Sequence, residues 1–249
     1  MLVAVAVATL GAEIQLARRG ADLVAPDVRT LAATFPAEAP PTQPATRVLW
    51  LGDSTAAGVG ASDPAHALSS QVGERLAAAS TSHDWDMDVI AVSGARISDV
   101  VRDQLPRVHD HTPDVVVISV GANDTVHLTG VRSFRVRYER LIDALVAQHV
   151  RPDHVVLIGV PDMGAPPRLA QPLRAVTGWR GRRLDRQVRR VARAKGVRYV
   201  DLFHATSKPF RSHPSEYFAR DDYHPSDAGY GLWANAVAPA VQIANELDA

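Results

Sequence analysis

Four polar residues of this chain could cooperate in nucleophilic catalysis. Ser54 follows the apolar run 48–51, Asn123 follows the run 114–120, and His224 comes three residues after Asp221. A serine hydroxyl is a weak nucleophile near neutral pH and needs a base within hydrogen-bond reach. Histidine titrates near that pH, and a carboxylate on its other nitrogen holds the ring in one tautomer. Asp221 and His224 in one tight turn would therefore give Ser54 such a base.

The elements that must position these residues are short apolar segments rich in Val and Ile. They cover residues 47–51, 88–92, 114–120, 154–160 and 197–202. Amphipathic helical patterns lie between them, over 65–79, 96–108, 132–149 and 180–195, and a last one runs from Ser226 to Leu247. Buried parallel strands read as continuous apolar runs of this kind. The alternation predicts an α/β fold, a three-layer doubly wound sandwich around a central, mostly five-stranded parallel sheet.

Ligands bind at the carboxyl ends of the strands in such sheets. Ser54, Gly94 and Asn123 all follow predicted strands, so we expect them to meet at one edge. Asp53 and Asp124 stand beside two of them and are expected to brace the loops by accepting hydrogen bonds from backbone N–H groups. At the other end of the site, Ser226 is the expected N-cap of the last helix, with Pro225 just outside it.

Four short motifs in this order resemble those of the SGNH hydrolases, the GDSL family of esterases and lipases. The motifs are Gly52-Asp53-Ser54, Gly94, Gly121-Ala122-Asn123-Asp124 and Asp221-Asp222-Tyr223-His224. The resemblance covers the chain from about residue 47 to its end. It implies a flavodoxin-like sandwich of the SGNH-hydrolase type and a serine esterase that uses no cofactor. One departure is Thr55, where the family usually has leucine, and this bears on packing and substrate preference.

The resemblance also implies roles for individual residues. Ser54, His224 and Asp221 would form the catalytic triad, and the oxyanion hole would consist of the backbone N–H groups of Ser54 and Gly94 with the side-chain amide of Asn123. A glycine at 94 fits, because a backbone donor that points into a pocket tolerates no side chain over it. An amide at 123 fits because it supplies N–H donors that a carboxylate lacks. Asp222 stays open as a competing partner for His224.

The substrate implied by the resemblance is a small-molecule or lipid acyl ester or thioester, with a short to medium acyl chain. The segment GVPDMGAPP at 159–167 resembles the wall that lipase-like members place beside the acyl chain. Apolar residues expected to bind substrate are Met163, Leu128 and Leu169, with Leu173 beside them. The alternative is a non-catalytic flavodoxin-like module in which the loop from Gly52 to Gly58 binds a phosphorylated ligand at a helix N-terminus. Such a module has no need of the Asp221 and His224 pair.

Composition excludes several other classes of protein. Lys+Arg and Asp+Glu are both 27, which argues against nucleic-acid binding. Cysteine is absent, so disulfides, thiolate nucleophiles and zinc–thiolate sites are excluded. We expect no metal site, because Asp84, Asp86 and Asp88 lack the remaining residues of a calcium loop and His109 and His111 lack a third ligand. The arginine-rich stretch 180–190 is interpreted as a solvated helix face, with anionic lipid or an acidic partner as the alternative.

The chain divides into three parts by composition. Residues 1–30 form an N-terminal hydrophobic and amphipathic segment, 31–46 a Pro-rich extended linker outside the core, and 47–249 the hydrolase-type domain. The first eleven residues are apolar, too few to span a bilayer, and no basic leader precedes them. They are either the apolar part of an export signal or membrane anchor, which favours the cell envelope or secretion, or a packed helix of a cytoplasmic protein. The sequence does not fix the oligomeric state.

Overall fold

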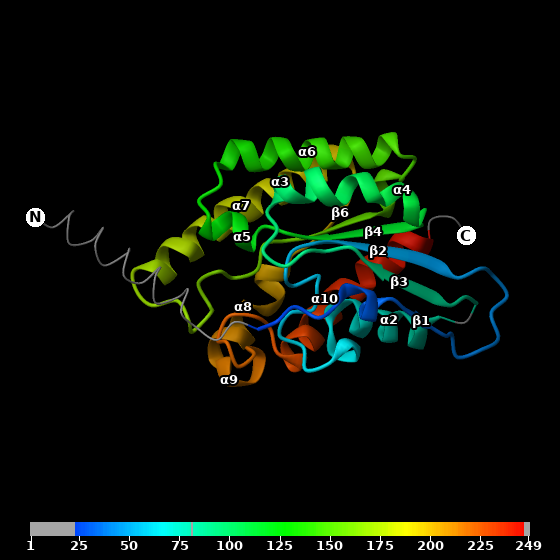
Figure 1. The fold of residues 1–249 in the computed structure, drawn as a ribbon, viewed down its shortest axis with the longest axis horizontal. Coiled ribbons are helices and arrows are strands. Elements are labelled where there is room, and N and C mark those ends of the chain that lie inside the picture. The colour runs from blue at the N-terminus through cyan, green and yellow to red at the C-terminus, as the bar shows by residue number, and fades with distance from the viewer. Residues whose placement is uncertain (1–22, 81, 247–249) are drawn as a thin grey trace, which may run out of the picture.

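The centre of the fold is a six-stranded sheet, seen in a computed structural model that describes residues 23–80 and 82–246 (Figure 1). The strands are β1 (Ala33–Phe35), β2 (Thr46–Gly52), β3 (Trp85–Val89), β4 (Val115–Ser119), β5 (Val155–Ile158) and β6 (Arg198–Val200). Their spatial order is β1-β3-β2-β4-β5-β6, and only the β1–β3 pairing is antiparallel. The five parallel strands have the flavodoxin-like order, in which the chain reverses direction of winding between β2 and β4.

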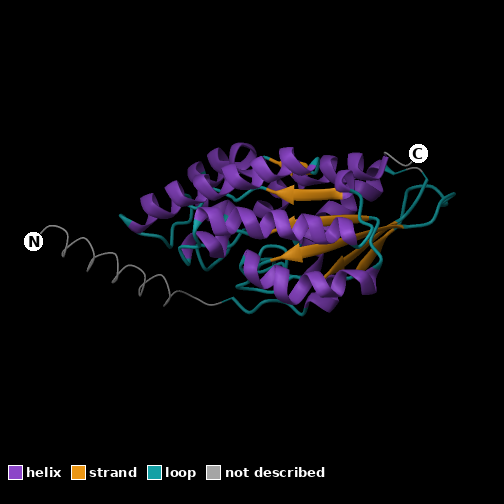
Figure 2. Cartoon of the chain, turned by 90° about the horizontal axis from the view of Figure 1, so that it is seen from above, coloured by secondary structure: helices purple, strands orange, loops and turns teal. Residues whose placement is uncertain are grey.

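Helices cover both faces of this sheet, which gives the expected three layers (Figures 1 and 2). One face carries α2 (Leu68–Ala79), α8 (Leu202–Ser212) and α10 (Asp227–Glu246). The other carries α3 (Ile97–Asp99), α4 (Val108–His111), α6 (Val131–Ala147) and α7 (Leu173–Lys195). Shorter helices are α5 (Ala122–Val126) and α9 (Pro214–Tyr217), with 3₁₀ turns at Val28–Leu31, Pro64–His66, Leu105–Arg107 and Pro152–His154 and a π turn at Val100–Gln104. The doubly wound α/β prediction is confirmed.

Successive residues of the central strands enter two different cores. Trp50 of β2 packs in the core beneath α2 and α10, while its neighbour Leu51 packs in the core beneath α6 and α7. Val117 and Ile118 of β4 divide in the same way. Because side chains alternate across a strand and both faces are covered, the central residues 48–51 of β2 and 115–118 of β4 are all apolar. This is why β2 and β4 read as unbroken hydrophobic runs.

The second strand of the parallel set lies at 85–89 and not at the predicted 88–92. Its burial alternates, with Trp85, Met87 and Val89 buried and Asp86 and Asp88 turned away from the core. Asp86 and Asp88 thus occupy the outward-facing positions of this strand. Backbone hydrogen bonds to β2 continue as far as Val92, whose N–H donates to Gly52 O at 3.1 Å.

The prediction that residues 31–46 lie outside the core is wrong for the first part of that segment. Leu31 is fully buried, and β1 adds an antiparallel edge strand to β3. Two of the aspartates once considered for calcium hold this strand: Asp86 accepts from Thr34 Oγ1 at 2.6 Å and Asp84 accepts from Ala37 N at 2.9 Å. The interpretations of the apolar N-terminus fall on residues 1–22, which lie outside the described residues.

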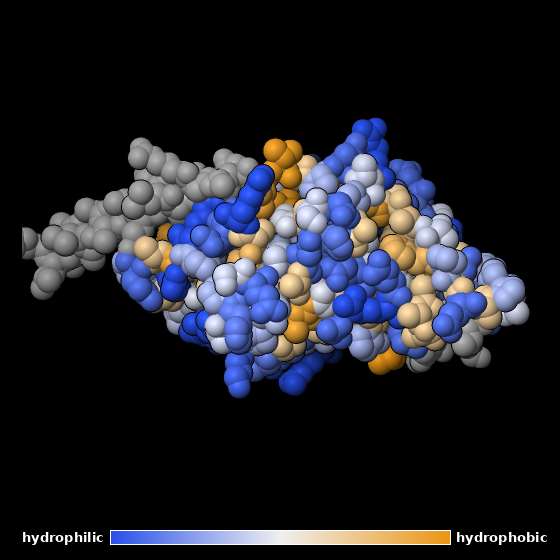
Figure 3. Space-filling model, turned by 90° about the horizontal axis from the view of Figure 1, so that it is seen from below, coloured by the Kyte–Doolittle hydropathy of each residue, from blue (hydrophilic) through white to orange (hydrophobic). Residues whose placement is uncertain are grey.

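Two further differences concern helices. α7 begins at Leu173 and not at 180, and α8 and α9 stand where no helix was expected. None of the helices in the described part of the chain combines the length and hydrophobicity needed to cross a membrane. The face seen in Figure 3 is largely polar, with apolar residues scattered over it, as is usual for protein surfaces.

Candidate active site

The first loop of the site starts at a glycine that no other residue could replace without rearrangement. Gly52, at the end of β2, has φ +146°, and a Cβ built on it would lie 1.9 Å from Ser119 O of β4. This close approach lets Asp53 N donate to Ser119 O at 3.0 Å. The chain therefore turns sharply above the junction of β2 and β4, and Ser54 lies at the point where the winding reverses.

The second part of the site is the turn before α10, which carries Asp221 and His224. His224 Nε2 lies 3.0 Å from Ser54 Oγ, and His224 Nδ1 lies 2.6 Å from Asp221 Oδ2. Residues 170 positions apart in the sequence thus form one continuous hydrogen-bonded chain. Asp221 is 1% exposed at its side chain and His224 is 17% exposed. The carboxylate is shielded from water while the imidazole and the serine border the open side.

The charge of Asp221 is set by two opposing effects. Burial alone would raise the pKa of this carboxyl, but hydrogen bonds from the His224 side chain and backbone and from Tyr223 N lower its pKa below the ordinary value. The two backbone bonds go to Oδ1, at 3.0 and 3.1 Å, so Oδ2 remains for the imidazole. An ionised carboxylate at Nδ1 places the ring proton there and leaves Nε2 as an acceptor for the serine hydroxyl.

Asp222, the competing partner considered from the sequence, has a different position. It is exposed, its φ is +56°, and its carbonyl accepts from Arg168 N at 3.1 Å. A left-handed conformation is one that glycine adopts freely and that Asp and Asn tolerate. Asp222 thus shapes the turn, and its neighbour Asp221 is the residue bonded to His224.

The end of this turn is fixed by the start of α10. Ser226 Oγ accepts from Gly229 N at 3.1 Å, which confirms the predicted N-cap. Ser226 Oγ also donates to Glu216 O at 2.6 Å, and Ala219 N donates to His224 O at 2.8 Å. His224 is therefore held between a capped helix and the segment that precedes the turn.

The residues expected to form an oxyanion hole lie on two adjoining segments. Asn123 Nδ2 donates one hydrogen bond to Ala95 O at 3.1 Å, and Asp124 Oδ2 accepts from Ile97 N at 2.9 Å. These bonds tie α5 to the loop that contains Gly94. An amide nitrogen has two N–H groups, so one of them remains for a ligand. Asn123 also lines the same cavity as Ser54 and His224.

The structure adds a conformational reason for glycine at 94. A Cβ at this position would meet no protein atom within 4 Å, so crowding by the protein does not require glycine. Its φ of +83° does favour glycine, because L side chains rarely adopt that conformation.

Asp53 braces the serine loop, as expected. Its Oδ1 accepts from Thr55 N at 3.0 Å and from Thr55 Oγ1 at 2.9 Å. Burial raises the pKa of Asp53 to about 6, although the hydrogen bonds from Thr55 and the nearby His224 act in the opposite direction. Thr55 Oγ1 also lies 2.9 Å from Ser119 Oγ. The threonine that departs from the family pattern therefore joins the loop to β4 by hydrogen bonds that leucine could not make.

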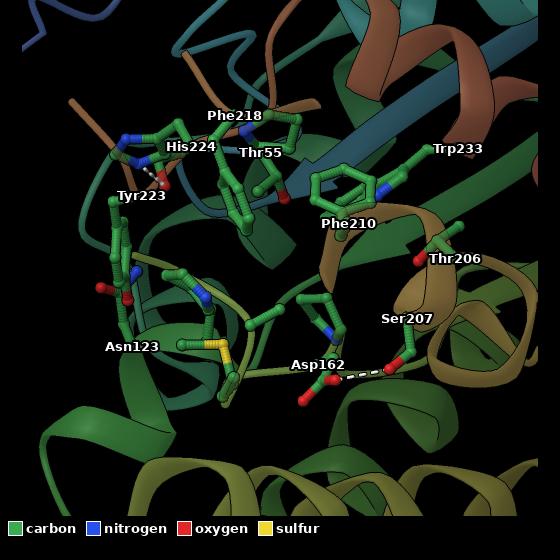
Figure 4. A pocket seen from close by; sticks show the side chains of 17 residues that line it. Thr55, Asn123, Asp162, Thr206, Ser207, Phe210, Phe218, Tyr223, His224 and Trp233 are labelled. Atoms are coloured by element: carbon green, nitrogen blue, oxygen red, sulfur yellow. Dashed lines mark hydrogen bonds between the residues drawn. The ribbon is translucent and has the colours of Figure 1, made fainter. Parts of the chain in front are cut away.

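A cavity opens beside Ser54 and His224, with about 550 Å³ of empty space including its mouth (Figure 4). Met163 lines it, as expected from the sequence. Leu128 does not, and is 64% exposed, while Leu169 and Leu173 are buried in the fold without lining this cavity. An apolar residue can lie at the surface, in the core or in a cavity wall, and the four predicted residues are divided among these three locations.

Much of the cavity wall comes from residues that the sequence analysis missed. These are Thr206, Ser207 and Phe210 of α8, together with Phe218 and Trp233. A local signal for α8 exists: Asp201 accepts from His204 N as an N-cap, and buried Leu202, Thr206 and Phe210 recur at four-residue spacing.

The wall also includes a buried carboxylate, Asp162, which is paired with an exposed arginine behind the wall. Asp162 accepts from Arg211 Nε at 2.6 Å and Nη2 at 3.0 Å, from Ser207 Oγ at 2.5 Å and from Gly164 N at 3.0 Å. Burial would raise the pKa of Asp162, but these hydrogen bonds lower it below the ordinary value. The carboxylate is thus ionised and fully bonded, which fixes α8 against the 161–167 loop.

The other clusters noted in the sequence have structural partners. His111 Nδ1 lies 2.8 Å from Asp88 Oδ2, and His109 Nε2 lies 2.9 Å from Asp110 Oδ1. The described residues contain no group of three or more side chains of the kinds that commonly ligate metals.

Part of the arginine-rich stretch on α7 is not a solvated face. Arg180 donates to Thr125 O at 3.1 Å and to Thr129 O at 2.9 Å. These carbonyls lie at and just beyond the end of α5, which carries Asn123. Arg180 therefore braces the segment that presents the amide.

Fold and site together are those of an α/β protein with a Ser-His-Asp arrangement. The chain is a doubly wound α/β protein with Ser54, His224 and Asp221 hydrogen-bonded at the carboxyl edge of its sheet. It has no G-x-S-x-G elbow of the α/β-hydrolase kind.

Comparison with known proteins places the chain within a family. Residues 50–232 match the GDSL-like lipase/acylhydrolase family, and the chain belongs to it. A GDSL-like esterase of Mycobacterium tuberculosis is 32% identical over 200 residues, which is 77% of this chain and 60% of the relative. This chain thus spans about 60% of the length of that relative.

Solved structures show the same fold. A lipase/acylhydrolase from Enterococcus faecalis has a TM-score of 0.61 at 23% identity, covering 79% of this chain and 95% of that one. An acetyl xylan esterase from Geobacillus stearothermophilus has a TM-score of 0.61 at 19% identity, covering 80% and 95%. The fold predicted from the sequence resemblance is confirmed.

Proposed function

We propose that this protein is a serine esterase that cleaves carboxylic esters or thioesters with short to medium acyl chains. The observation that carries the proposal is the bridge made by His224, 3.0 Å from Ser54 Oγ on one side and 2.6 Å from Asp221 on the other. This arrangement supplies a nucleophile, a base and the group that orients the base. Membership of a family of lipases and acylhydrolases supports the same reaction class.

In the proposed mechanism, Ser54 Oγ attacks the carbonyl carbon of the ester while His224 Nε2 takes the hydroxyl proton. Asp221 stabilises the imidazolium that forms. The tetrahedral oxyanion is bound by the backbone N–H groups of Ser54 and Gly94 and by the free N–H of Asn123. The intermediate collapses as His224 gives its proton to the leaving alcohol or thiol, which leaves an acyl group on Ser54 Oγ. Water then attacks the acyl carbon while His224 takes its proton, and His224 returns that proton to Ser54 Oγ as the acid is released.

The phosphate-binding alternative is disfavoured by the loop itself. Ala57 N donates to Asp53 O, Gly58 N to Thr55 O and Val59 N to Ser54 O. These N–H groups are used within the loop and are not available to a phosphate. Buried Asp53 beneath the loop would also repel an anion whenever it is ionised.

The size of the acyl group is proposed from the cavity. Met163, Phe210 and Phe218 provide an apolar wall beside the catalytic residues, and the charged Asp162 lines the same cavity. Because a carboxylate interrupts the apolar lining, the cavity favours a chain of a few carbons over a long fatty chain. Rates with p-nitrophenyl esters of increasing acyl length would test this directly, and a maximum at a long fatty acyl chain would contradict it.

The experiment that tests the function is labelling with a fluorophosphonate. We expect the probe to modify the peptide that contains Ser54, and Ser54→Ala to lose both labelling and esterase activity. Removing a triad serine costs on the order of 10⁶ in kcat in a well-studied protease. Ser62→Ala is the matched control, since Ser62 Oγ bonds Asp227 and not His224. Labelling of another serine, with activity kept in Ser54→Ala, would overturn the proposal.

A further inference from the structure

The outer side of α7 carries a row of arginines. This helix contains nine arginine and lysine residues and one acidic residue, Asp185, although the whole chain has no net charge. Four of the arginines are exposed and follow one another at intervals of three or four residues. At about 100° per residue they share one side of the helix with Trp179. We call these four residues the arginine row: Arg182, Arg186, Arg190 and Arg193.

The charge of the arginine row is not balanced by nearby carboxylates. Within residues 23–80 and 82–246, no acidic side chain forms an ion pair with it. The acidic side chains of α6, of α7 and of the N-cap of α8 are bonded elsewhere: Glu139 to Arg135, Asp143 to Lys195, Asp185 to Tyr199 and Asp201 to Arg189. A cluster of unbalanced charges of one sign creates a local potential that attracts ions of the other sign.

An exposed tryptophan stands at one end of the arginine row. Trp179 is 50% exposed, whereas the other three tryptophans of the chain, Trp50, Trp85 and Trp233, are buried. The guanidinium of Arg183 lies over the Trp179 ring, 4.7 Å from its centroid. An indole that is exposed beside cations is typical of the headgroup region of a bilayer, where one part of the ring contacts apolar groups and the N–H contacts polar ones.

The neighbouring helix α6 extends this surface. α6 and α7 pack side by side over one face of the sheet, so their outer sides face the same way (Figures 1 and 2). The outer side of α6 presents Arg132 and Arg140 together with the exposed valines Val136 and Val146. Positive charges interspersed with apolar side chains match the boundary between anionic headgroups and acyl chains. A nucleic acid or an acidic peptide would neutralise the charges but would leave the valines without an apolar partner.

We propose that the outer face of α6 and α7 binds the surface of a membrane that contains anionic lipids, through the arginine row and Trp179. This interaction is separate from the chemistry of the active site and does not depend on it. It would nevertheless bring the cavity close to the lipid, because the Trp179 end of α7 adjoins the cavity wall. Thr177 Oγ1 of α7 donates to the carbonyl of Met163 at 2.8 Å, and Met163 lines the cavity.

The first test is binding of the full chain to lipid vesicles, measured by co-sedimentation. The vesicles consist of phosphatidylcholine alone or of equal parts of phosphatidylcholine and phosphatidylglycerol. We expect binding to the anionic vesicles that weakens as sodium chloride is added, since salt screens exposed charges. Equal binding to both kinds of vesicle would overturn the proposal, because charge would then play no part.

The second test uses the fluorescence of Trp179. Because the other tryptophans are buried, a change in emission on adding vesicles reports on this residue. We expect anionic vesicles to shift the emission to shorter wavelength and to protect it from acrylamide, and Trp179→Phe to abolish both effects. Binding to anionic vesicles without either effect would show that another part of the chain makes the contact, and would overturn the proposal.

The third test removes two charges from the arginine row. Each arginine near an anionic surface strengthens binding about fivefold, so Arg186→Gln combined with Arg190→Gln should lower the partition constant roughly ten- to thirtyfold. The matched control is Arg29→Gln combined with Lys208→Gln. It removes the same charge from exposed side chains on the opposite face, where Lys208 belongs to α8 and Arg29 precedes buried Leu31. An equal loss in both double variants would refute the role of the row.

The remaining outcomes separate this surface from other occupants and from the esterase function. If a DNA duplex produces the change in Trp179 emission and anionic vesicles do not, the face binds a polyanion and the membrane proposal is wrong. Both double variants should hydrolyse a soluble p-nitrophenyl ester as the wild type does, which also checks their folding. A wild type that hydrolyses the ester but binds no vesicles would refute the membrane surface and leave the esterase function intact.

Discussion

Replacing Asp221 by asparagine tests how the carboxylate acts on His224. Asparagine has the same shape, and its Oδ1 can still accept from Tyr223 N and His224 N, so the turn should keep its conformation. Its Nδ2 would then stand at the position of Oδ2, 2.6 Å from His224 Nδ1 in the present structure. Two donors cannot face each other, so the ring must adopt the tautomer with its proton on Nε2.

The expected loss follows from that tautomer. With a proton on Nε2, the imidazole donates to Ser54 Oγ and can no longer accept the hydroxyl proton. The same substitution in a serine protease lowers kcat about 10⁴-fold, and we expect a similar loss here. The pKa of Asp221 is below the ordinary value, so the wild-type carboxylate should be ionised throughout the working pH range and give no titration of its own near neutrality.

The control lies one residue along the chain. Asp222→Asn makes the same chemical change at an exposed position with φ +56°, which asparagine tolerates, so kcat should stay within about twofold. Both variants should be measured by kcat on one p-nitrophenyl ester, with circular dichroism to compare folding. A crippled Asp222→Asn beside a nearly active Asp221→Asn would refute the assignment of the triad.

Three further predictions concern the oxyanion, the buried carboxyl and metals. Asn123→Ala removes one donor and should lower kcat about 10²- to 10³-fold with little change in KM, because the bond strengthens only in the transition state; a change in KM alone would make Asn123 a substrate anchor. Asp53 has its pKa raised from 3.8 to about 6, so the folded state holds this proton more tightly and loses stability as pH rises from about 4 to about 6. At roughly 1.4 kcal/mol per pKa unit this is about 3 kcal/mol, and denaturant unfolding of Asp53→Asn should lack that pH-dependent loss, whereas parallel profiles for the two proteins would contradict the shift. Ester hydrolysis should be unaffected by EDTA, because Ser54, His224 and Asp221 already supply nucleophile and base; a loss restored by a divalent ion would show that the chemistry needs a metal.

The central part of the fold could be predicted because its signals are local. β2, β4 and β5 are buried on both faces, and their continuous apolar runs ended within one or two residues of the predicted bounds. Asp221 and His224 could be paired from the sequence because they are only three positions apart, and residues so close in the chain cannot lie far apart in a turn. Ser54 and Asn123 could be brought to them because strands of a parallel sheet end at one edge.

Strand β1, the bounds of β3 and most of the cavity wall could not be predicted, because they depend on contacts between residues far apart in the sequence. β1 is three residues long, and what holds it is its pairing with β3. The bounds of β3 were predicted three residues too late because Asp86 and Asp88, which face outward at the edge of the parallel set, interrupt its apolar pattern. The positions of Leu128 and Leu169 away from the cavity could not be foreseen for a related reason. Leu128 and Leu169 are as apolar as Met163, but only the tertiary fold decides which of them borders the cavity.

Four aspartates in the loops around the site show how bracing and catalysis can be told apart. Asp53, Asp124, Asp162 and Asp221 each accept at least one backbone N–H of a loop in the site, from Thr55, Ile97, Gly164 and Tyr223 respectively. Burial raises the pKa of the first two, which have no cationic hydrogen-bond partner, whereas Arg211 and His224 help to lower the pKa of the last two.

The bracing function needs only an acceptor oxygen, which an asparagine at position 53 would retain. Asp221 differs because its second oxygen binds an imidazole that is itself bonded to the serine. Asp162 is as buried and as charged, yet its partners are an arginine, a serine and a backbone N–H, none of which is a base that can take the proton of Ser54. The position of one titratable partner, and not burial or charge alone, therefore distinguishes Asp221 from the other three.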